Sequence, residues 1–187
     1  MFKARAAKPN SFKMTGSDMI TRIYSHFRRK MAYYLVNHSL AGTNPHYFAL
    51  KRKLLNAAGC KIGEGTKVVG PIVNTGHLEI GRNCWIGANF VVHGNGAVML
   101  GDNIDVGPDV TFMTGTHHLG SSERRAGEGY NCDITIGSGC WLGGKSIFLN
   151  SIQVGEGCVV AAGGLVCKTI SSNKLVGGVP AKIIKEL

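Results

Sequence analysis

Residues 136–166 read IGSGCW-LGGKSI-FLNSIQ-VGEGCV-VAAGGL-V, and an aliphatic or aromatic residue opens each group of six. Upstream, the same period appears at Ile80, Ile86, Val92 and Val98 and, after a slip of two residues, at Leu100, Val106 and Phe112. A period of six fits neither an amphipathic helix nor an alternating strand. It predicts a prism of short strands, in which each inward residue stacks on its counterpart one coil away, about 4.8 Å along the axis.

The repeat unit itself explains how the chain turns at the corners of such a prism. It reads aliphatic, Gly, any, Asn/Asp/Gly, small or aliphatic, any, as in residues 80–85 and 154–159. Gly, Asn and Asp adopt unusual backbone angles at low cost, and stacked coils bury a core that one coil cannot. With three units per triangular coil, residues 61–170 hold about six coils. We therefore predict an all-β solenoid, a parallel β-helix of hexapeptide repeats, over residues 61–187.

The net charge of +10 is unevenly distributed. Residues 1–60 carry eleven Lys or Arg and one acid, Asp18, whereas residues 61–187 carry ten of each sign. This division predicts a basic, helical N-terminal segment over residues 1–60 in front of a globular body. With 44% hydrophobic and 17% charged residues, wholesale disorder is excluded, and no apolar run reaches the length of a spanning helix. No nucleic-acid-binding motif accompanies the charge, so no nucleic-acid partner is expected.

Two helices are predicted in the N-terminal segment. Residues 17–41 have apolar side chains at helical spacing after a capping Ser17, and residues 44–59 begin with Asn44-Pro45 and end at Gly59. Two roles stay open for this pair. The helices can cap the open first coil of the prism, or they can anchor the protein peripherally at the inner face of a membrane through anionic lipid.

The positions of the cysteines favour a packing role over a metal-binding or redox role. Cys84, Cys140 and Cys158 all occupy the fifth position of the repeat, which needs a small inward residue. No C-x-x-C pair is present, so a zinc or redox motif has no support. No secretory signal is recognised, and we expect a cytoplasmic protein with reduced thiols.

The repeat is interrupted once, by the glycine-rich polar stretch of residues 113–133. An excursion of this length from a regular solenoid usually carries function, so we predict an active-site loop here. His117 stands at its base. A histidine held on a rigid scaffold beside a loop is the expected setting for a general base, although position alone leaves a structural role open.

Several runs resemble the hexapeptide-repeat acyltransferases of the maltose/galactoside O-acetyltransferase type over about residues 60–187: TGTH at 114–117, CWLGG at 140–144, VVAAG at 159–163 and GGVPAKIIK at 177–185. The resemblance implies a left-handed β-helix, a homotrimer and acetyl-CoA as acyl donor, with no metal required. Residues 54–63 look similar to sugar O-acetyltransferases of exopolysaccharide, capsule and O-antigen pathways. That likeness implies a sugar or lipid-linked saccharide as acceptor.

The same resemblance implies roles for individual residues. His117 would take the proton from an acceptor hydroxyl during direct attack on the thioester, and the backbone N–H of Gly144 would stabilise the oxyanion. Contacts to the cofactor would come from Gly144, Ala162, Lys168, Lys182 and Lys185. Contacts to the acceptor would come from Trp85, Asn89, His93, Asn95 and Glu128, the last of which could instead orient His117.

Other functions remain open at this point. Trp85 and Gly87 stand where relatives that acetylate galactosides or maltose carry Tyr and Asn, so the resemblance does not name the acceptor. N-acetylation of an amino sugar or nucleotide sugar would use the same histidine and groove. A γ-type carbonic anhydrase or a non-catalytic trimeric scaffold would share the fold.

Overall fold

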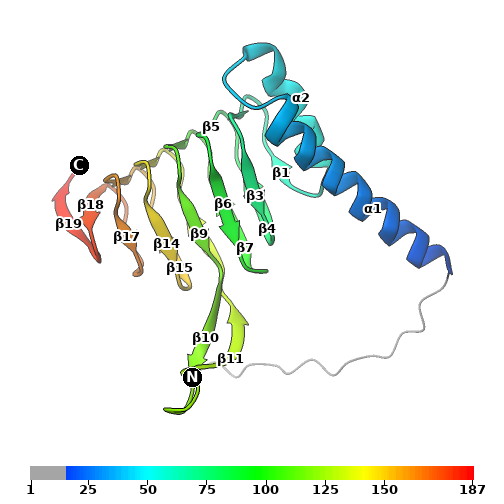
Figure 1. Cartoon of the computed structure of the whole chain (residues 1–187). Helices are drawn as coiled ribbons and strands as arrows, with labels where there is room; N and C mark the ends of the chain where they lie inside the picture. The colour runs from blue at the N-terminus through cyan, green and yellow to red at the C-terminus, as the bar shows by residue number, and fades with distance from the viewer. Residues whose placement is uncertain (1–15) are drawn as a thin grey trace.

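Three sheets, parallel except for the antiparallel pairing of the last strand, form the faces of a left-handed prism in the computed structural model, which describes residues 16–187 (Figure 1). Face A contains β1 (Lys61–Ile62), β4 (His77–Ile80), β7 (Ala97–Leu100), β12 (Ile134–Ile136) and β15 (Ile152–Val154). Face B contains β2 (Lys67–Val68), β5 (Trp85–Ile86), β8 (Asp105–Val106), β13 (Trp141–Leu142), β16 (Val159–Val160), β18 (Lys174–Gly178) and β19 (Ala181–Glu186). Face C contains β3 (Ile72–Asn74), β6 (Phe90–His93), β9 (Thr111–Met113), β14 (Ile147–Leu149) and β17 (Leu165–Val166).

The number of coils can be read from the corner between faces A and B. One residue per coil has a positive φ there, between 55° and 77°, and it is always the fourth residue of a repeat: Gly65, Asn83, Asn103, Gly139, Gly157 and Asn173. Only Gly and Asn fill this corner, because other side chains pay a steric cost in the left-handed region. The six positions confirm the predicted solenoid of about six coils.

The interior is a set of stacked side chains drawn from the first and fifth positions of each repeat. On the inner side of face C, the Phe112 ring lies 5.4 Å from Phe90 and 4.8 Å from Phe148 between ring centroids. Cys84, Cys140 and Cys158 are also buried. Burial raises the pKa of the Cys140 thiol to about 11, so this side chain stays protonated and packs as a small apolar residue, as predicted.

The N-terminal segment folds as two helices joined by a short π-helical turn. α1 spans Gly16–Tyr34, the π-helix η1 spans Leu35–Ser39, and α2 spans Pro45–Ala57. The Asn44 side chain caps α2 by accepting a hydrogen bond from the His46 N–H. The two predicted helices are present, but the first is α-helical only to Tyr34 and continues as the π-helical turn, and the second ends at Ala57, two residues before Gly59. A cap by the Ser17 side chain lies outside the described residues. Within residues 16–187, no helix has both the length and the apolar character needed to cross a membrane.

Side chains from this segment seal the exposed edge of the first coil. The Asn56 amide exchanges two hydrogen bonds with the backbone of Ile62 in β1, and the Asn37 amide does the same with Ile72 in β3. Next to β2, the Lys51 Nζ donates to the carbonyls of Gly42 and Val69 at 2.8 and 3.1 Å. Each face of the first coil therefore ends on a side-chain partner instead of an unpaired strand edge.

α1 takes only a limited part in this cap. Its last turns and η1 bury Ala32 and Val36 against the prism, and Val36 joins the same apolar core as Leu55 of α2 and the coils. The earlier part of α1 leaves Ile20, Ile23 and other large apolar side chains exposed. The capping role is thus correct for α2 and the end of α1, but wrong for most of α1.

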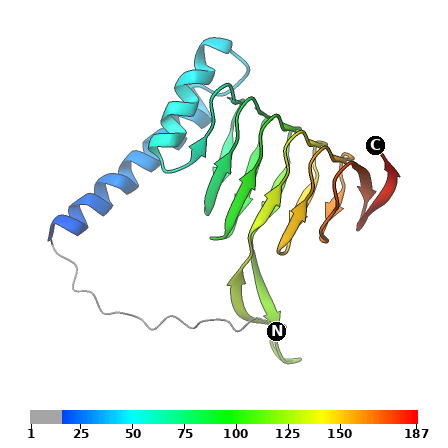
Figure 2. The same cartoon turned by 180° about the vertical axis from the view of Figure 1, so that it is seen from behind.

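The segment predicted as a loop is a two-stranded antiparallel hairpin. β10 (Gly115–Leu119) pairs with β11 (Ala126–Asn131), and the pair projects from the corner between faces C and A (Figure 2). It leaves the prism after β9, and the chain re-enters at β12 in register with β7. The interruption therefore adds an arm to the prism without disturbing the stacking of the coils.

Thr114 fixes the base of the hairpin and is fully buried. Its N–H and its Oγ1 both donate to the His93 carbonyl, at 2.8 and 2.9 Å. The same hydroxyl accepts from the Gly96 N–H at 3.2 Å, and the Thr114 carbonyl accepts from the Cys132 N–H. One residue thus ties both strands of the hairpin to the coil below.

The two-residue slip of the repeat is a longer corner at residues 93–96, directly beneath the hairpin. Side chains at the end of the hairpin and just after it accept hydrogen bonds from the backbone of this corner. Asn131 Oδ1 accepts from the Asn95 N–H at 3.1 Å, and Asp133 Oδ1 accepts from the Ala97 N–H at 2.8 Å. Gly94 has a φ of +96°, and a Cβ there would lie 2.3 Å from the Gly115 nitrogen. The longer corner at residues 93–96 is therefore the surface on which the base of the hairpin packs.

Replacing Lys51 by Met tests the seal on the first coil. The apolar chain keeps the volume but leaves the Gly42 and Val69 carbonyls without their donor, so we expect the free energy of unfolding to fall by about 1–3 kcal/mol. Chemical denaturation monitored by circular dichroism measures this. Lys53→Met is the matched control, since Lys53 is exposed on the same helix, and it should change stability by less than about 0.5 kcal/mol. Equal stability of the two variants would contradict the assigned role of Lys51.

Replacing Thr114 by Val tests the anchor of the hairpin. The substitution keeps the shape and removes the hydroxyl, leaving the buried Gly96 N–H without an acceptor, which costs about 1–3 kcal/mol. We expect a lower unfolding midpoint and faster proteolytic cleavage after Arg124 or Arg125 in the hairpin. Ser121→Ala, at an exposed position beyond β10, is the control. A Thr114→Val protein cleaved at the wild-type rate would show that the hairpin does not depend on this hydroxyl.

Candidate functional site

His117 lies in β10 with one ring nitrogen committed and the other free. Its Nδ1 lies 2.9 Å from the carbonyl oxygen of Gly127 on the opposite strand. A carbonyl only accepts, so Nδ1 carries the proton of the neutral ring and Nε2 carries the lone pair. The side chain is exposed to solvent. This arrangement holds an imidazole ready to accept a proton at Nε2.

A hollow of about 450 Å³ surrounds this histidine. It lies between the hairpin and the longer corner beneath it, and its lining is Gly94, Asn95, Gly115, Thr116, His117, Gly129, Tyr130 and Asn131. Of the predicted acceptor residues, only Asn95 belongs to this lining. Tyr130 and Asn131 were not among the predicted site residues, although both lie inside the single interruption of the repeat. An aromatic ring beside amide groups suits a ligand with hydroxyls and an apolar surface.

Two other predicted acceptor residues lie near the hollow without lining it. His93 is exposed at the end of β6, in register with Met113, and its carbonyl is the acceptor that holds Thr114. Glu128 is exposed on β11. The partner that orients His117 is the main-chain carbonyl of Gly127, which leaves no orienting contact for Glu128 among the hydrogen bonds of residues 16–187.

Gly144 and Ala162 lie on successive coils at the corner between faces B and C. The Gly163 N–H donates to the Gly144 carbonyl at 2.9 Å, which joins the two coils. Across residues 16–187, the N–H groups of Gly144 and Ala162 donate no hydrogen bond. A Cβ on Gly144 would lie 3.1 Å from the Pro108 carbonyl oxygen, so the backbone is open only at a glycine. The corner thus presents two free backbone donors that can bind a carbonyl or an oxyanion.

Asn89 and Trp85 belong to this second corner and to face B beside it. Asn89 sits at a positive φ, and its Nδ2 donates to Asp109 Oδ1 at 2.9 Å. The Trp85 ring contacts Phe48 of α2 edge-on, with ring centroids 5.9 Å apart. Trp85 therefore contributes to packing of the cap, and the structure does not bring it next to His117.

The corners that carry His117 and Gly144 lie at opposite ends of the face C strands. Each of these strands begins at the B–C corner and ends at the C–A corner, from which the hairpin projects. The structure thus brings Asn95 to His117 and places Asn89 on the same corner as Gly144 and Ala162, but two and three coils before them; it separates the two groups. One chain alone does not assemble the predicted catalytic pair.

Two of the three predicted phosphate-binding lysines meet at the C-terminal end of the prism. Lys168 and Lys182 line one hollow of about 370 Å³, together with Ser171 and Thr169. Lys185 is exposed on β19 but is not part of this lining. Paired ammonium groups beside hydroxyls can hold a phosphate.

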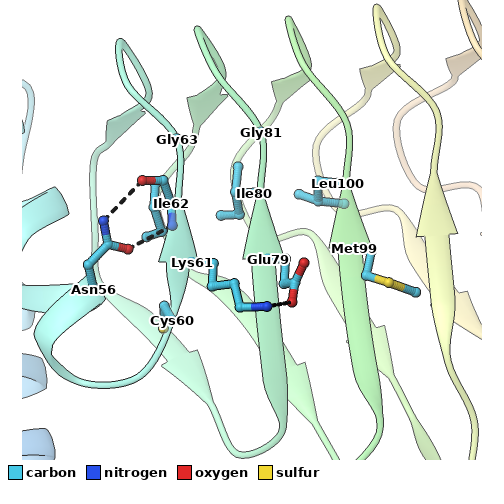
Figure 3. Close-up of a pocket in the computed structure, with 10 residues that line it drawn as sticks. All are labelled: Asn56, Cys60, Lys61, Ile62, Gly63, Glu79, Ile80, Gly81, Met99 and Leu100. Carbon is cyan, nitrogen blue, oxygen red and sulfur yellow. Dashed lines mark hydrogen bonds and ion pairs between the residues drawn. The ribbon is translucent and has the colours of Figure 1, made fainter.

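Another hollow, of about 540 Å³, lies on the outer side of face A near α2 (Figure 3). Its polar groups are occupied: Lys61 pairs with Glu79 at 2.5 Å, and Asn56 caps β1. The hydrogen bond from Lys61, and next that from His77, lowers the pKa of the half-buried Glu79 carboxyl. No proton-accepting group is left free there. Within residues 16–187, His, Cys, Asp and Glu form no cluster of three or more able to hold a metal.

Known proteins share both the repeat and the fold. The family described as hexapeptide repeat of succinyl-transferase matches residues 78–108 and 133–166. A galactoside O-acetyltransferase of Escherichia coli (strain K12) is 30% identical over 162 residues, covering 86% of this chain and 78% of that protein. A galactoside O-acetyltransferase of Lactococcus lactis is 28% identical over 138 residues, covering 72% and 67%.

Solved structures extend the likeness to the helices. A hexapeptide-repeat acetyltransferase of Vibrio cholerae, complexed with acetyl-CoA, superposes with a TM-score of 0.74 at 24% identity, covering 92% of this chain and 90% of that one, and shows the shared fold. A galactoside acetyltransferase in complex with coenzyme A gives a TM-score of 0.62 at 25% identity, covering 93% and 92%. The chain belongs to the hexapeptide-repeat acetyltransferases of the galactoside and maltose O-acetyltransferase type, and it is an acyltransferase.

Proposed function

We infer that this protein transfers an acetyl group from acetyl-CoA to a hydroxyl of a sugar, in the synthesis of a polysaccharide. The observation that carries the proposal is the geometry of His117, whose Nδ1–H is held by the Gly127 carbonyl while Nε2 faces a hollow lined by Asn95, Tyr130 and Asn131. The relatives that acetylate galactosides support the sugar as acceptor class. The likeness of residues 54–63 to enzymes of polysaccharide pathways supports a saccharide precursor, free or lipid-linked.

The reaction proceeds without a covalent enzyme intermediate. Nε2 of His117 takes the proton from the acceptor hydroxyl as that oxygen attacks the thioester carbonyl carbon. The tetrahedral intermediate places a negative charge on the former carbonyl oxygen, and a free backbone N–H, that of Gly144, donates to it. Collapse breaks the carbon–sulfur bond, the coenzyme A thiolate takes the proton from His117, and the acetyl ester remains on the sugar.

The corner between faces B and C provides the groove for the acyl donor. The free N–H of Ala162 lies one coil beyond Gly144 and suits an amide carbonyl of the pantetheine arm. Lys168 and Lys182 share a hollow at the end of the prism and suit the phosphates of coenzyme A, with Lys185 as a further positive charge. Trp85, Asn89, His93 and Glu128 remain candidates for contacts with the acceptor from the rims of the two corners.

The separation of His117 from Gly144 argues for a homotrimer. The outer side of face C exposes no Lys, Arg, Asp or Glu; its outward residues are Val73, Val91, His93, Thr111, Met113, Ile147, Leu149, Leu165 and Cys167. Such an apolar sheet is typical of a subunit interface. Packing three copies through this face sets the hairpin of each beside the B–C corner of the next, so that each site takes His117 from one chain and Gly144 from its neighbour.

Removing the imidazole tests the proposed base. We expect His117→Ala and His117→Asn to lose about 10²–10⁴-fold in kcat, because both lack a proton acceptor at Nε2. His117→Asn retains an N–H donor for Gly127, so the hairpin stays in place. His46→Ala, at an exposed position of α2, is the control and should match the wild type. Release of coenzyme A is followed with a panel of sugars, amino sugars and nucleotide sugars.

The panel also separates the competing functions. Turnover with hydroxyl acceptors that vanishes in both His117 variants supports O-acetylation, whereas turnover confined to amino sugars would identify an N-acetyltransferase. A fully active His117→Ala protein would contradict the assignment of the base. Absence of any acetyl-CoA binding by calorimetry would leave a non-catalytic scaffold as the better account.

Mixing two inactive variants tests whether the site is shared between chains. His117→Ala lacks the base, and Ala162→Trp fills the groove, so neither homotrimer should turn over. In randomly mixed trimers, one interface in each mixed trimer pairs an intact His117 with an intact groove, and we expect about a quarter of the wild-type rate. Native mass spectrometry verifies the mixing. Mixed trimers without recovered activity would place the two groups of one site in a single chain.

A further inference from the structure

We propose that the outer face of α1 docks on an anionic lipid bilayer. This face consists of seven large side chains on one side of the helix: Met19, Ile20, Ile23, Tyr24, Phe27, Met31 and Tyr34. They are 44–70% exposed, and no other element of residues 16–187 displays such a run of apolar side chains to solvent. The proposal goes beyond the transferase activity, since it concerns a surface remote from both corners of the site.

α1 has a second, separate face for the prism. Val36 and Ala32 are buried, and Arg29 donates to the Asn74 carbonyl at 2.8 Å while lying 5.5 Å from the centre of the Tyr33 ring. At 100° per residue, these inward positions lie on the side of the helix opposite Ile23 and Phe27. Packing within the chain therefore already uses one face and leaves the other without a partner. The apolar surface continues into a groove between α1 and α2, lined by Phe27, Met31 and Leu54.

Two basic residues accompany the outer face. Arg28 lies at its margin, four residues after Tyr24, and Lys30 lies one turn from Phe27 and Tyr34; both are exposed. Neither forms an ion pair with another of residues 16–187. Large apolar side chains accompanied by exposed cations are the pattern of a helix that lies in a bilayer surface, with its rings among the acyl chains and its cations at anionic headgroups.

Charge decides between a bilayer and a second copy of the chain. Asp18 is the only acid before Glu64, whereas residues 1–60 carry eleven Lys or Arg. Pairing two α1 helices through their outer faces would bring the Arg28 and Lys30 side chains of the two copies together with no carboxylate to neutralise them. An anionic membrane surface supplies that negative charge along the whole length of the helix, about 28 Å.

The position of α1 also fits a membrane-bound acceptor. Both α1 and the hairpin that carries His117 extend beyond the same edge of the prism (Figures 1 and 2). α1 therefore reaches toward the side of the molecule on which the hairpin projects. A bilayer that follows α1 and also reaches the hairpin would bring the saccharide of a lipid-linked acceptor near the proposed base.

Vesicle sedimentation with the full chain tests the proposal without acetyl-CoA or acceptor, so its outcome is independent of the proposed function. The probes are phosphatidylcholine vesicles with and without about one third phosphatidylglycerol. We expect the wild type to bind the anionic vesicles, and Ile23→Ser/Phe27→Ser to bind at least about tenfold more weakly. Arg28→Glu/Lys30→Glu should lose the preference for phosphatidylglycerol.

Two control variants carry the same changes elsewhere. Val179→Ser/Ile184→Ser removes two exposed apolar residues at the C-terminal end of the prism, and Lys53→Glu/Lys67→Glu makes the same change in net charge outside α1 and the hairpin; both should bind vesicles like the wild type. No binding by the wild type, or binding that survives both α1 variants, would overturn the proposal. So would a fall in oligomer size in Ile23→Ser/Phe27→Ser with unchanged circular dichroism, since the face would then belong to a second copy of the chain.

Discussion

Every coil of this prism depends on backbone hydrogen bonds to the coil before it. Parallel pairing keeps each inward residue directly over its counterpart, as Ile86 lies in register with Val106 and Leu142 with Val160. The corners must then repeat as well, and a left-handed residue recurs at the same place in each coil. The first coil has no coil before it, so its three strand edges need other partners. Asn37, Asn56 and Lys51 meet that need by presenting side-chain groups in place of a preceding strand.

The regularity of the stacked coils explains why the candidate base lies where the repeat is interrupted. Inside the prism, identical environments recur in coil after coil and leave no position distinct from its neighbours. His117 stands out because the hairpin leaves the stack, and the hairpin can do so because the longer corner at residues 93–96 makes room beneath it. Asn131 and Asp133 then satisfy the backbone donors that the extra residues introduce. The longer corner, the hairpin and His117 are therefore one structural unit.

Much of this architecture was predictable from the sequence, because a period of six leaves few alternatives. Buried Ile136, Leu142 and Phe148 and the left-handed Asn83 follow directly from the repeat. The hairpin was not predictable: residues 113–133 contain no alternating apolar pattern, and their pairing depends on the buried hydroxyl of Thr114, which is set by tertiary contacts. Trp85 makes a further contact that was not predictable. The likeness in sequence named it as an acceptor residue, and the structure adds an edge-on contact with Phe48 of the cap, which depends on how α2 docks on the first coils.

The tie between His117 and the main-chain oxygen of Gly127 has an evolutionary consequence. Side chains can be exchanged by mutation, but the main-chain carbonyl at position 127 is present whichever residue occupies that position. Selection can therefore replace Tyr130, Asn131 or Glu128 in search of a new acceptor while the imidazole keeps its tautomer. Such a division between a fixed proton acceptor and a replaceable lining would let one scaffold diversify its acceptors without rebuilding its chemistry.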